Sequence, residues 1–199
     1  MSADLLLALA GFAFVSSITP GPNNLMIMAS GANFGVRRSL PHALGISLGF
    51  GVMILLVGLG LARLFAAVPA LRLVLAVLSV GYLLWLAWRI ARAAAPEGPA
   101  GRGRPLGFLQ AAAFQWVNPK AWTMALTAVT LYTAGGPWAV LPVTAVFTAI
   151  NLPSISVWML MGVQMRRWLS TPARLRGFNW TMAGLLVASL WPTLGALLG

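Results

Sequence analysis

The stretch Ser17-Ile18-Thr19-Pro20-Gly21-Pro22-Asn23-Asn24-Leu25 breaks an apolar run near the start of this 199-residue chain, and Val117-Asn118-Pro119-Lys120 breaks another in its second half. Within a lipid bilayer every backbone N–H and C=O group needs a partner in the protein, because water is not there to replace it. Such breaks are therefore expected only where they are buried in protein or line a wet cavity. Paired breaks at matching places in two halves are typical of a transporter's substrate site.

The composition predicts an integral membrane protein. Hydrophobic residues make up 60% of the chain and charged residues 8%, whereas soluble domains have about 25% charged residues. A transmembrane β-barrel would show alternating polarity over strands of about 10 residues, and the chain shows no such alternation. The net charge of +11 comes from arginines between apolar runs, where the positive-inside bias places them, so we expect no nucleic-acid partner.

Hydropathy predicts an all-α protein with six transmembrane helices in one transporter domain, residues 1–199. The expected spans are 4–30, 40–66, 70–93, 107–134, 138–165 and 175–198. Residues 1–94 carry three spans and 107–199 the other three, joined by a linker at 95–106. Because three is odd, the halves face opposite ways, as in an inverted repeat with broken first and fourth helices. A six-helix bundle without internal symmetry is the alternative.

The arginines predict the orientation. Alternate connections put ten of them on one face: Arg37, Arg38, Arg89, Arg92, Arg102, Arg104, Arg166, Arg167, Arg174 and Arg176. Only Arg63 and Arg72 fall on the other. The arginine-rich face is expected to be cytoplasmic, which puts both termini outside. In a bacterial cytoplasmic (inner) membrane the outside is the periplasm.

Both breaks have the chemistry of a helix start. Thr19 and Asn118 are good N-cap residues, and Pro20 and Pro119 suit the first helical position. The start of a half-helix offers unpaired N–H groups and about half a positive charge, which attract a carboxylate. Gly21 lets a ligand come close to the backbone.

Eleven residues are expected to bind the substrate: Thr19, Pro20, Gly21, Pro22, Asn23, Asn24, Gln115, Asn118, Pro119, Lys120 and Asn151. Asn23 and Asn24 either orient a zwitterion or join neighbouring helices. Lys120 is the only lysine; an ionisable group in a span costs about 2.5 kcal/mol or more, so it is either functional or snorkels to the interface. Asn151 either lines the cavity or pairs with backbone groups freed by Pro153.

The remaining ionisable residues exclude most enzymatic chemistry. His42, the only histidine, is a candidate for proton coupling, with a structural hydrogen-bonding role as the alternative. The only acids, Asp4 and Glu97, lie near the chain start and in the linker, so no carboxylate pair or acidic proton relay is available in the membrane. With no cysteine either, we predict no metal, no cofactor and no catalytic activity.

Further motifs follow the first break in a fixed order: Gly35-Val36-Arg37-Arg38-Ser39, Gly45-Ile46-Ser47-Leu48-Gly49-Phe50 and Gly81-Tyr82-Leu83-Leu84-Trp85-Leu86-Ala87-Trp88. Together with the two breaks they resemble the LysE/RhtB family of amino-acid exporters. Pro22-Asn23-Asn24 and the Gly81–Trp88 stretch are similar to its branch that exports cysteine and O-acetylserine. The resemblance implies a six-span inner-membrane protein that exports small amino acids, driven by the proton gradient. Many relatives carry aspartate where Asn23 stands, so this chain departs from any coupling that needs a carboxylate there.

The expected function is export of small neutral amino acids or derivatives, such as cysteine, O-acetylserine, threonine or homoserine, by alternating access between the breaks. A membrane channel or a non-transporting scaffold, whose breaks only serve helix packing, is the alternative. The expected partners are a small amino acid and the lipid bilayer, and a homo-oligomer is left open.

Overall fold

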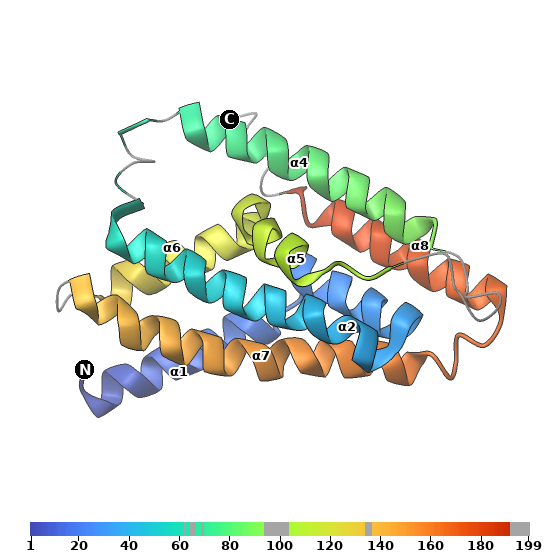
Figure 1. Ribbon diagram of the computed structural model, residues 1–199, viewed down its shortest axis with the longest axis horizontal. Helices are drawn as coiled ribbons and strands as arrows, with labels where there is room; N and C mark the ends of the chain where they lie inside the picture. Colours follow the sequence, from blue (N-terminus) through green and yellow to red (C-terminus); the bar gives the residue numbers. More distant parts are fainter. Residues whose placement is uncertain (62, 64–66, 69, 94–103, 134–136, 192–199) are drawn as a thin grey trace.

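The computed structural model is all-helical in the part it describes, residues 1–61, 63, 67–68, 70–93, 104–133 and 137–191 (Figure 1). Its α-helices are α1 (Ala3–Ile18), α2 (Pro22–Leu56), α4 (Ala70–Ala91), α5 (Phe108–Phe114), α6 (Pro119–Tyr132), α7 (Val140–Met165) and α8 (Pro172–Ala188). A π-helical turn (Val57–Leu61) follows α2, and 3-10 turns (Gln115–Val117 and Pro137–Ala139) precede α6 and α7. Most of the expected linker, 95–103, lies outside the described residues, as do 62, 64–66, 134 and 192–198 of three expected spans.

The surface of the helices is apolar. Leu7, Leu109 and Trp180 are 74%, 78% and 65% exposed, while Gln115 and Asn179 are fully buried. Polar groups inside and large apolar side chains outside are the reverse of a soluble domain's surface and fit contact with lipid. Among the described residues, three helical stretches are long and apolar enough to cross a membrane: Pro22–Leu61, Leu73–Ala91 and Val140–Met165.

Helix α2 folds back on itself at Gly35. This glycine has φ 77° and ψ 176°, a conformation that side chains with a Cβ rarely adopt. The hydroxyls of Ser30 and Ser39 are hydrogen-bonded at 2.7 Å, although nine residues of straight helix would separate them by about 13 Å. The first arm (22–34) and the second arm (36–56) therefore form a hairpin, and its turn lies between the expected spans 4–30 and 40–66.

The two predicted breaks are present, but the capping prediction is right for only one. Asn118 is the N-cap of α6, where its side chain accepts a hydrogen bond from the backbone N–H of Lys120 at 3.2 Å, and Pro119 follows it. In the first break, Thr19 is instead the C-cap of α1, and α2 starts with Gly21 as N-cap and Pro22 in the first turn. The prediction of an N-cap at Thr19 is wrong because the second proline of the motif, not the first, begins the helix.

The same order of elements occurs in both halves. A first helix (α1 or α5) ends at a break, a short helix begins with proline (the first arm of α2, or α6), a long helix follows (the second arm of α2, or α7), and another helix (α4 or α8) completes the half. The two short helices are similar in length: the first arm of α2 has 13 residues, and α6 has 14. The four helices that flank the breaks thus come from both halves.

Helix α7 crosses the first arm of α2 in direct backbone contact. A Cβ atom on Gly31 would collide with the carbonyl oxygen of Met159, and one on Gly162 would collide with that of Met28. On the second arm, Gly45 and Gly49 face the backbone of α5 in the same way. The glycines Gly31, Gly45 and Gly49 of α2 therefore form a packing surface, as small residues do at membrane helix contacts.

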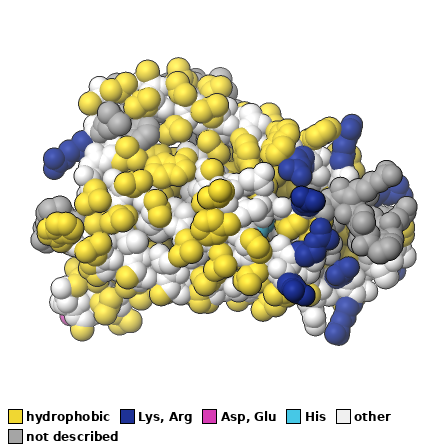
Figure 2. Space-filling model, in the orientation of Figure 1, with side chains coloured by type: hydrophobic (Ala, Val, Ile, Leu, Met, Phe, Trp, Pro, Cys, Tyr) yellow, Lys and Arg dark blue, Asp and Glu magenta, His cyan; other side chains and the backbone are white. Residues whose placement is uncertain are grey.

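Arginine side chains gather at one end of the molecule, where α2 reverses and α7 and α8 meet (Figures 1 and 2). This end carries Arg37 and Arg38 beside the reversal, Arg166 and Arg167 after α7, and Arg174 and Arg176 in α8. The chain begins at the opposite end (Figure 1).

Candidate substrate-binding site

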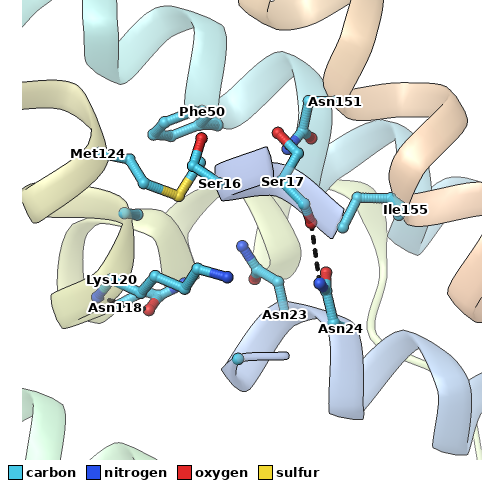
Figure 3. A pocket seen from close by; sticks show the side chains of 12 residues that line it. Ser16, Ser17, Asn23, Asn24, Phe50, Asn118, Lys120, Met124, Asn151 and Ile155 are labelled. Atoms are coloured by element: carbon cyan, nitrogen blue, oxygen red, sulfur yellow. Dashed lines mark hydrogen bonds between the residues drawn. The ribbon is translucent and has the colours of Figure 1, made fainter. Parts of the chain in front are cut away.

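A pocket lies where the two breaks face each other (Figure 3). The space among its lining atoms is about 300 Å³ when the open solvent at its mouth is included, but the room it leaves for water-sized groups is only about 20 Å³. The lining side chains come from α1, both arms of α2, α6 and α7, so both halves of the chain build it: Ser16, Ser17, Gly21, Asn23, Asn24, Phe50, Asn118, Lys120, Ala121, Met124, Asn151 and Ile155.

The last three carbonyl groups at the end of α1, those of Ser17, Ile18 and Thr19, accept hydrogen bonds from donors in other helices or beyond the break. Asn24 donates through Nδ2 to the carbonyl oxygens of Ser17 at 2.9 Å and Thr19 at 2.7 Å. The indole N–H of Trp158 in α7 donates to the carbonyl of Ile18 at 3.0 Å. A helix that stops in mid-membrane leaves such carbonyls unpaired, and these side chains satisfy them.

Lys120 supplies the remaining donors. Its Nζ lies 2.6 Å from the carbonyl oxygen of Thr19, 2.9 Å from the Thr19 hydroxyl and 3.3 Å from the carbonyl oxygen of Pro20. A cation is stabilised here because the C-terminal end of a helix carries partial negative charge. The stem of the lysine passes over Gly21, where a Cβ would lie 2.6 Å from its Cδ. The ammonium group therefore points to the first break.

A pair of side-chain amides joins the breaks a second time. Asn23 donates through Nδ2 to Oε1 of Gln115 at 2.9 Å, and Gln115 donates through Nε2 to Oδ1 of Asn23 at 3.2 Å. Gln115 is fully buried and also donates to the carbonyl of Ala111 at 2.9 Å. The amide groups of this pair thus satisfy each other.

Asn151 is different, because one of its polar atoms has no partner. Its Nδ2 donates to the Ser17 hydroxyl at 3.1 Å, but its Oδ1 is buried and accepts no hydrogen bond from any described residue. The side chain is 4% exposed and lines the pocket from α7, opposite Lys120 and Asn23 (Figure 3). An unpaired buried acceptor costs about 1–3 kcal/mol, so it calls for an explanation.

Six of the predicted binding residues line the pocket: Gly21, Asn23, Asn24, Asn118, Lys120 and Asn151. Thr19 and Pro20 contribute oxygens to Lys120, and Gln115 pairs with Asn23, so these three touch the lining side chains. Pro22 and Pro119 begin the two half-helices.

The sequence did not single out six other lining residues: Ser16, Ser17, Phe50, Ala121, Met124 and Ile155. The two serines directly precede the first break, and that position was a usable signal. Phe50, Met124 and Ile155 resemble every other apolar residue of the spans, so only the fold reveals them.

His42 lies outside the pocket lining, in the second arm of α2. It is 2% exposed, and neither ring nitrogen has a hydrogen-bond partner within the part that the structure describes. The structural hydrogen bond considered for this residue is therefore not found there. The described residues also contain no group of three His, Cys, Asp or Glu side chains that could hold a metal ion.

Known proteins match the chain along nearly its whole length. The family described as LysE type translocator matches residues 14–194. A cysteine/O-acetylserine efflux protein of Klebsiella pneumoniae is 30% identical over 190 residues, 94% of this chain and 95% of that protein. Proteins of the same name from Salmonella typhimurium and Escherichia coli K12 are 35% and 32% identical over 133 residues, 66% of this chain and 67% of theirs. No solved structure matches the chain.

Proposed function

The chain belongs to the LysE type translocator family, and from this premise we propose that it exports small neutral amino acids or their derivatives across the cytoplasmic membrane of a bacterium. Membership of a translocator family makes it a multi-pass membrane transporter and not an enzyme. The names of its relatives suggest cysteine and O-acetylserine as the first substrates to test, followed by threonine and homoserine.

The observation that carries the proposal is the unpaired Oδ1 of Asn151, buried beside the pocket. The α-ammonium group of an amino acid would donate to it and remove the cost of leaving it unpaired. The carbonyl groups at the end of α1 already accept hydrogen bonds from Asn24, Trp158 and Lys120, whereas Oδ1 of Asn151 accepts none from the described residues. Asn151 is therefore the proposed ammonium ligand.

The substrate carboxylate is assigned to the opposite wall. Lys120 provides the only formal charge among the lining residues, and it is positive. The first turns of α2 and α6 lie beside it, and helix starts attract anions. A charge-assisted hydrogen bond from an ammonium to a carboxylate is about twice as strong as one between neutral groups, so Lys120 is the proposed main contact.

The side chain of the substrate would meet Phe50, Met124 and Ile155, with the Ser16 hydroxyl nearby. No acidic residue is among the lining residues, so a cationic side chain would find no counter-charge. A small uncharged side chain fits both properties. The apolar lining and the lack of an acidic lining residue therefore support neutral substrates over basic ones.

For the transport cycle we propose six spans in two inverted halves, with alternating access at their shared pocket. The matching order of elements in the halves supports the repeat. The arginine-rich end is assigned to the cytoplasm and the start of α1 to the periplasm. A reporter that is active only in the cytoplasm should give no signal when fused to the N-terminus; a strong signal would reverse this orientation.

His42 is the proposed coupling residue if export is driven by protons. It is the only histidine of the chain, and the membrane spans hold no acid that could take the proton instead. It stands apart from the pocket, so coupling through it would use a conformational change and not direct contact with the substrate.

Reconstitution tests the function directly. Proteoliposomes should take up or release labelled O-acetylserine with a rate that saturates, that responds to an imposed pH gradient and that is inhibited by unlabelled serine-like amino acids but weakly by lysine. A rate that rises linearly with concentration and ignores the gradient would indicate a channel. No flux of any tested amino acid would overturn the proposal.

A further inference from the structure

The two half-helices that start at the breaks reach across the pocket in a crossed pattern. Lys120 is the residue after the first proline of α6, and it binds the end of α1. Asn23 is the residue after the first proline of α2, and it binds Gln115 in the turn that follows α5. Each half therefore uses the corresponding position to hold the other half's first helix.

We propose that these contacts are two crossed clamps that hold the empty pocket closed, and that the substrate carboxylate opens the Lys120 clamp by replacing the oxygens of Thr19 and Pro20. This rests on the proposed function, since it assigns the carboxylate to Lys120. It gives the lysine a second role, as the group through which binding changes the conformation.

The bonding of the lysine favours this exchange. An ammonium group has three donors, and all three are used on the first break when the pocket is empty. It can bind a carboxylate only by releasing at least one of them. The release leaves little unpaired: the Thr19 carbonyl keeps its bond from Asn24 at 2.7 Å, and Thr19 and Pro20 are exposed.

The amide clamp lacks this freedom. Gln115 is fully buried, and breaking its pair with Asn23 would leave its Oε1 without a partner, while its Nε2 would keep only the bond to Ala111. In the proposed binding mode neither charge of the substrate is assigned to it, because the carboxylate goes to Lys120 and the ammonium to Asn151. We therefore expect the Lys120 clamp to open while the amide clamp holds, so that the pocket opens along one edge only.

The chain contains no cysteine, so a spin-label experiment can follow the clamp without background labelling. Gly11 in α1 and Thr123 in α6 are exposed, and Gly11→Cys with Thr123→Cys would place one label on each side of the Lys120 clamp. Distances between the labels are measured in the full-length protein, empty, with O-acetylserine, and with the carboxamide of O-acetylserine, which lacks the carboxylate.

In the empty protein we expect one main distance, with an open form of at most about 10%. O-acetylserine should make a second distance the major one, and its carboxamide should not. Lys120→Met keeps the stem over Gly21 but removes the donors, so it should populate the second distance without any ligand. Thr19→Val, which removes one of the three acceptors, should give a smaller increase.

Asn33→Leu is the matched control. Asn33 lies on the same arm of α2 as Asn23 and forms a reciprocal amide pair of the same kind, with Asn179 of α8 at 3.0 and 3.4 Å. It is far along the arm from the break, so its loss should weaken the fold but leave the distance distribution unchanged. An equal change in this variant would show general loosening and overturn the clamp.

The outcomes separate this inference from the function it rests on. If the protein binds O-acetylserine but Lys120→Met has the distances of the parent, the clamp is wrong and the proposed function stands. If Lys120→Met opens the protein but no amino acid binds, the contact holds the pocket closed, and both carboxylate-driven opening and the proposed function are wrong.

Discussion

Replacing Asn151 with leucine should change stability and binding in opposite directions. Leucine has nearly the shape of asparagine but no polar atoms. In the empty protein the substitution removes the unpaired Oδ1, which costs about 1–3 kcal/mol, and loses the hydrogen bond to Ser17, which contributes about 0.5–1.5 kcal/mol. The variant should therefore range from about 0.5 kcal/mol less stable to about 2.5 kcal/mol more stable than the parent.

Binding should weaken in the same variant. A hydrogen bond to a charged group contributes about 1.5–3 kcal/mol, and each 1.4 kcal/mol is a factor of ten in affinity. Loss of the Asn151 contact to the substrate ammonium should thus raise the Kd by about 10- to 150-fold. A residue that gives up stability in the empty state for a contact with the ligand is characteristic of a binding site.

Thermal unfolding in detergent and titration with O-acetylserine measure the two effects on one sample. Asn33→Leu serves again as the comparison, because Asn33 is buried and its amide is fully paired with Ala29 and Asn179. That change should cost about 2 kcal/mol or more and leave the Kd within a factor of two or so. If Asn151→Leu instead loses stability as Asn33→Leu does and keeps the parent's Kd, the argument from its unpaired oxygen is refuted.

Three other predictions concern the packing, the coupling and the lysine. Gly162→Ala should destabilise the protein by about 1–3 kcal/mol in thermal unfolding, since its Cβ meets the Met28 carbonyl, whereas Gly184→Ala, with open space around it, should not lower the melting temperature. His42→Gln should abolish uptake driven by a pH gradient in proteoliposomes but leave exchange of labelled for unlabelled substrate, and loss of both or neither would remove His42 from coupling. Gly21→Ala should raise the Kd for O-acetylserine, because the new methyl group displaces the lysine stem, and an unchanged Kd would contradict the position of that stem.

The parts of the fold that depend on chain-wide composition could be predicted from the sequence. An all-helical membrane protein follows from the apolar content, and the breaks follow from proline, which cannot continue a helix hydrogen-bond ladder. The reversal at Gly35 falls on the first residue of the arginine-bearing connection Gly35–Arg38, between the expected spans 4–30 and 40–66. The sequence does not show how the two arms pack, because the Ser30–Ser39 contact and the contacts with α7 are not local properties.

Half of the residues that line the candidate site could be predicted from the sequence. Polar residues beside a break are conspicuous in an apolar chain, so Asn23, Asn118 and Lys120 stand out. Their partners are not visible, because the contacts of Lys120 join residues 100 and 101 positions apart and the Asn23–Gln115 pair joins residues 92 apart. The choice between a functional and a snorkelling lysine was open for that reason; the structure shows that its ammonium group is hydrogen-bonded to the first break.

In the proposed function Lys120 is a carboxylate-binding cation in a pocket that has no acidic lining residue. An ammonium group left alone in a span would be costly, and a nearby Asp or Glu, the usual remedy, would compete with the substrate carboxylate for the same cation. The end of α1 offers an alternative: neutral carbonyl groups and the partial negative charge of a helix end stabilise Lys120 without neutralising it. A full negative charge on the substrate can then displace these oxygens, which an internal salt bridge would resist. Recognition in this proposal needs the broken first helix, because the carbonyl groups at its end bind Lys120 and can be replaced by the substrate carboxylate. A continuous helix in its place would leave Lys120 without these partners.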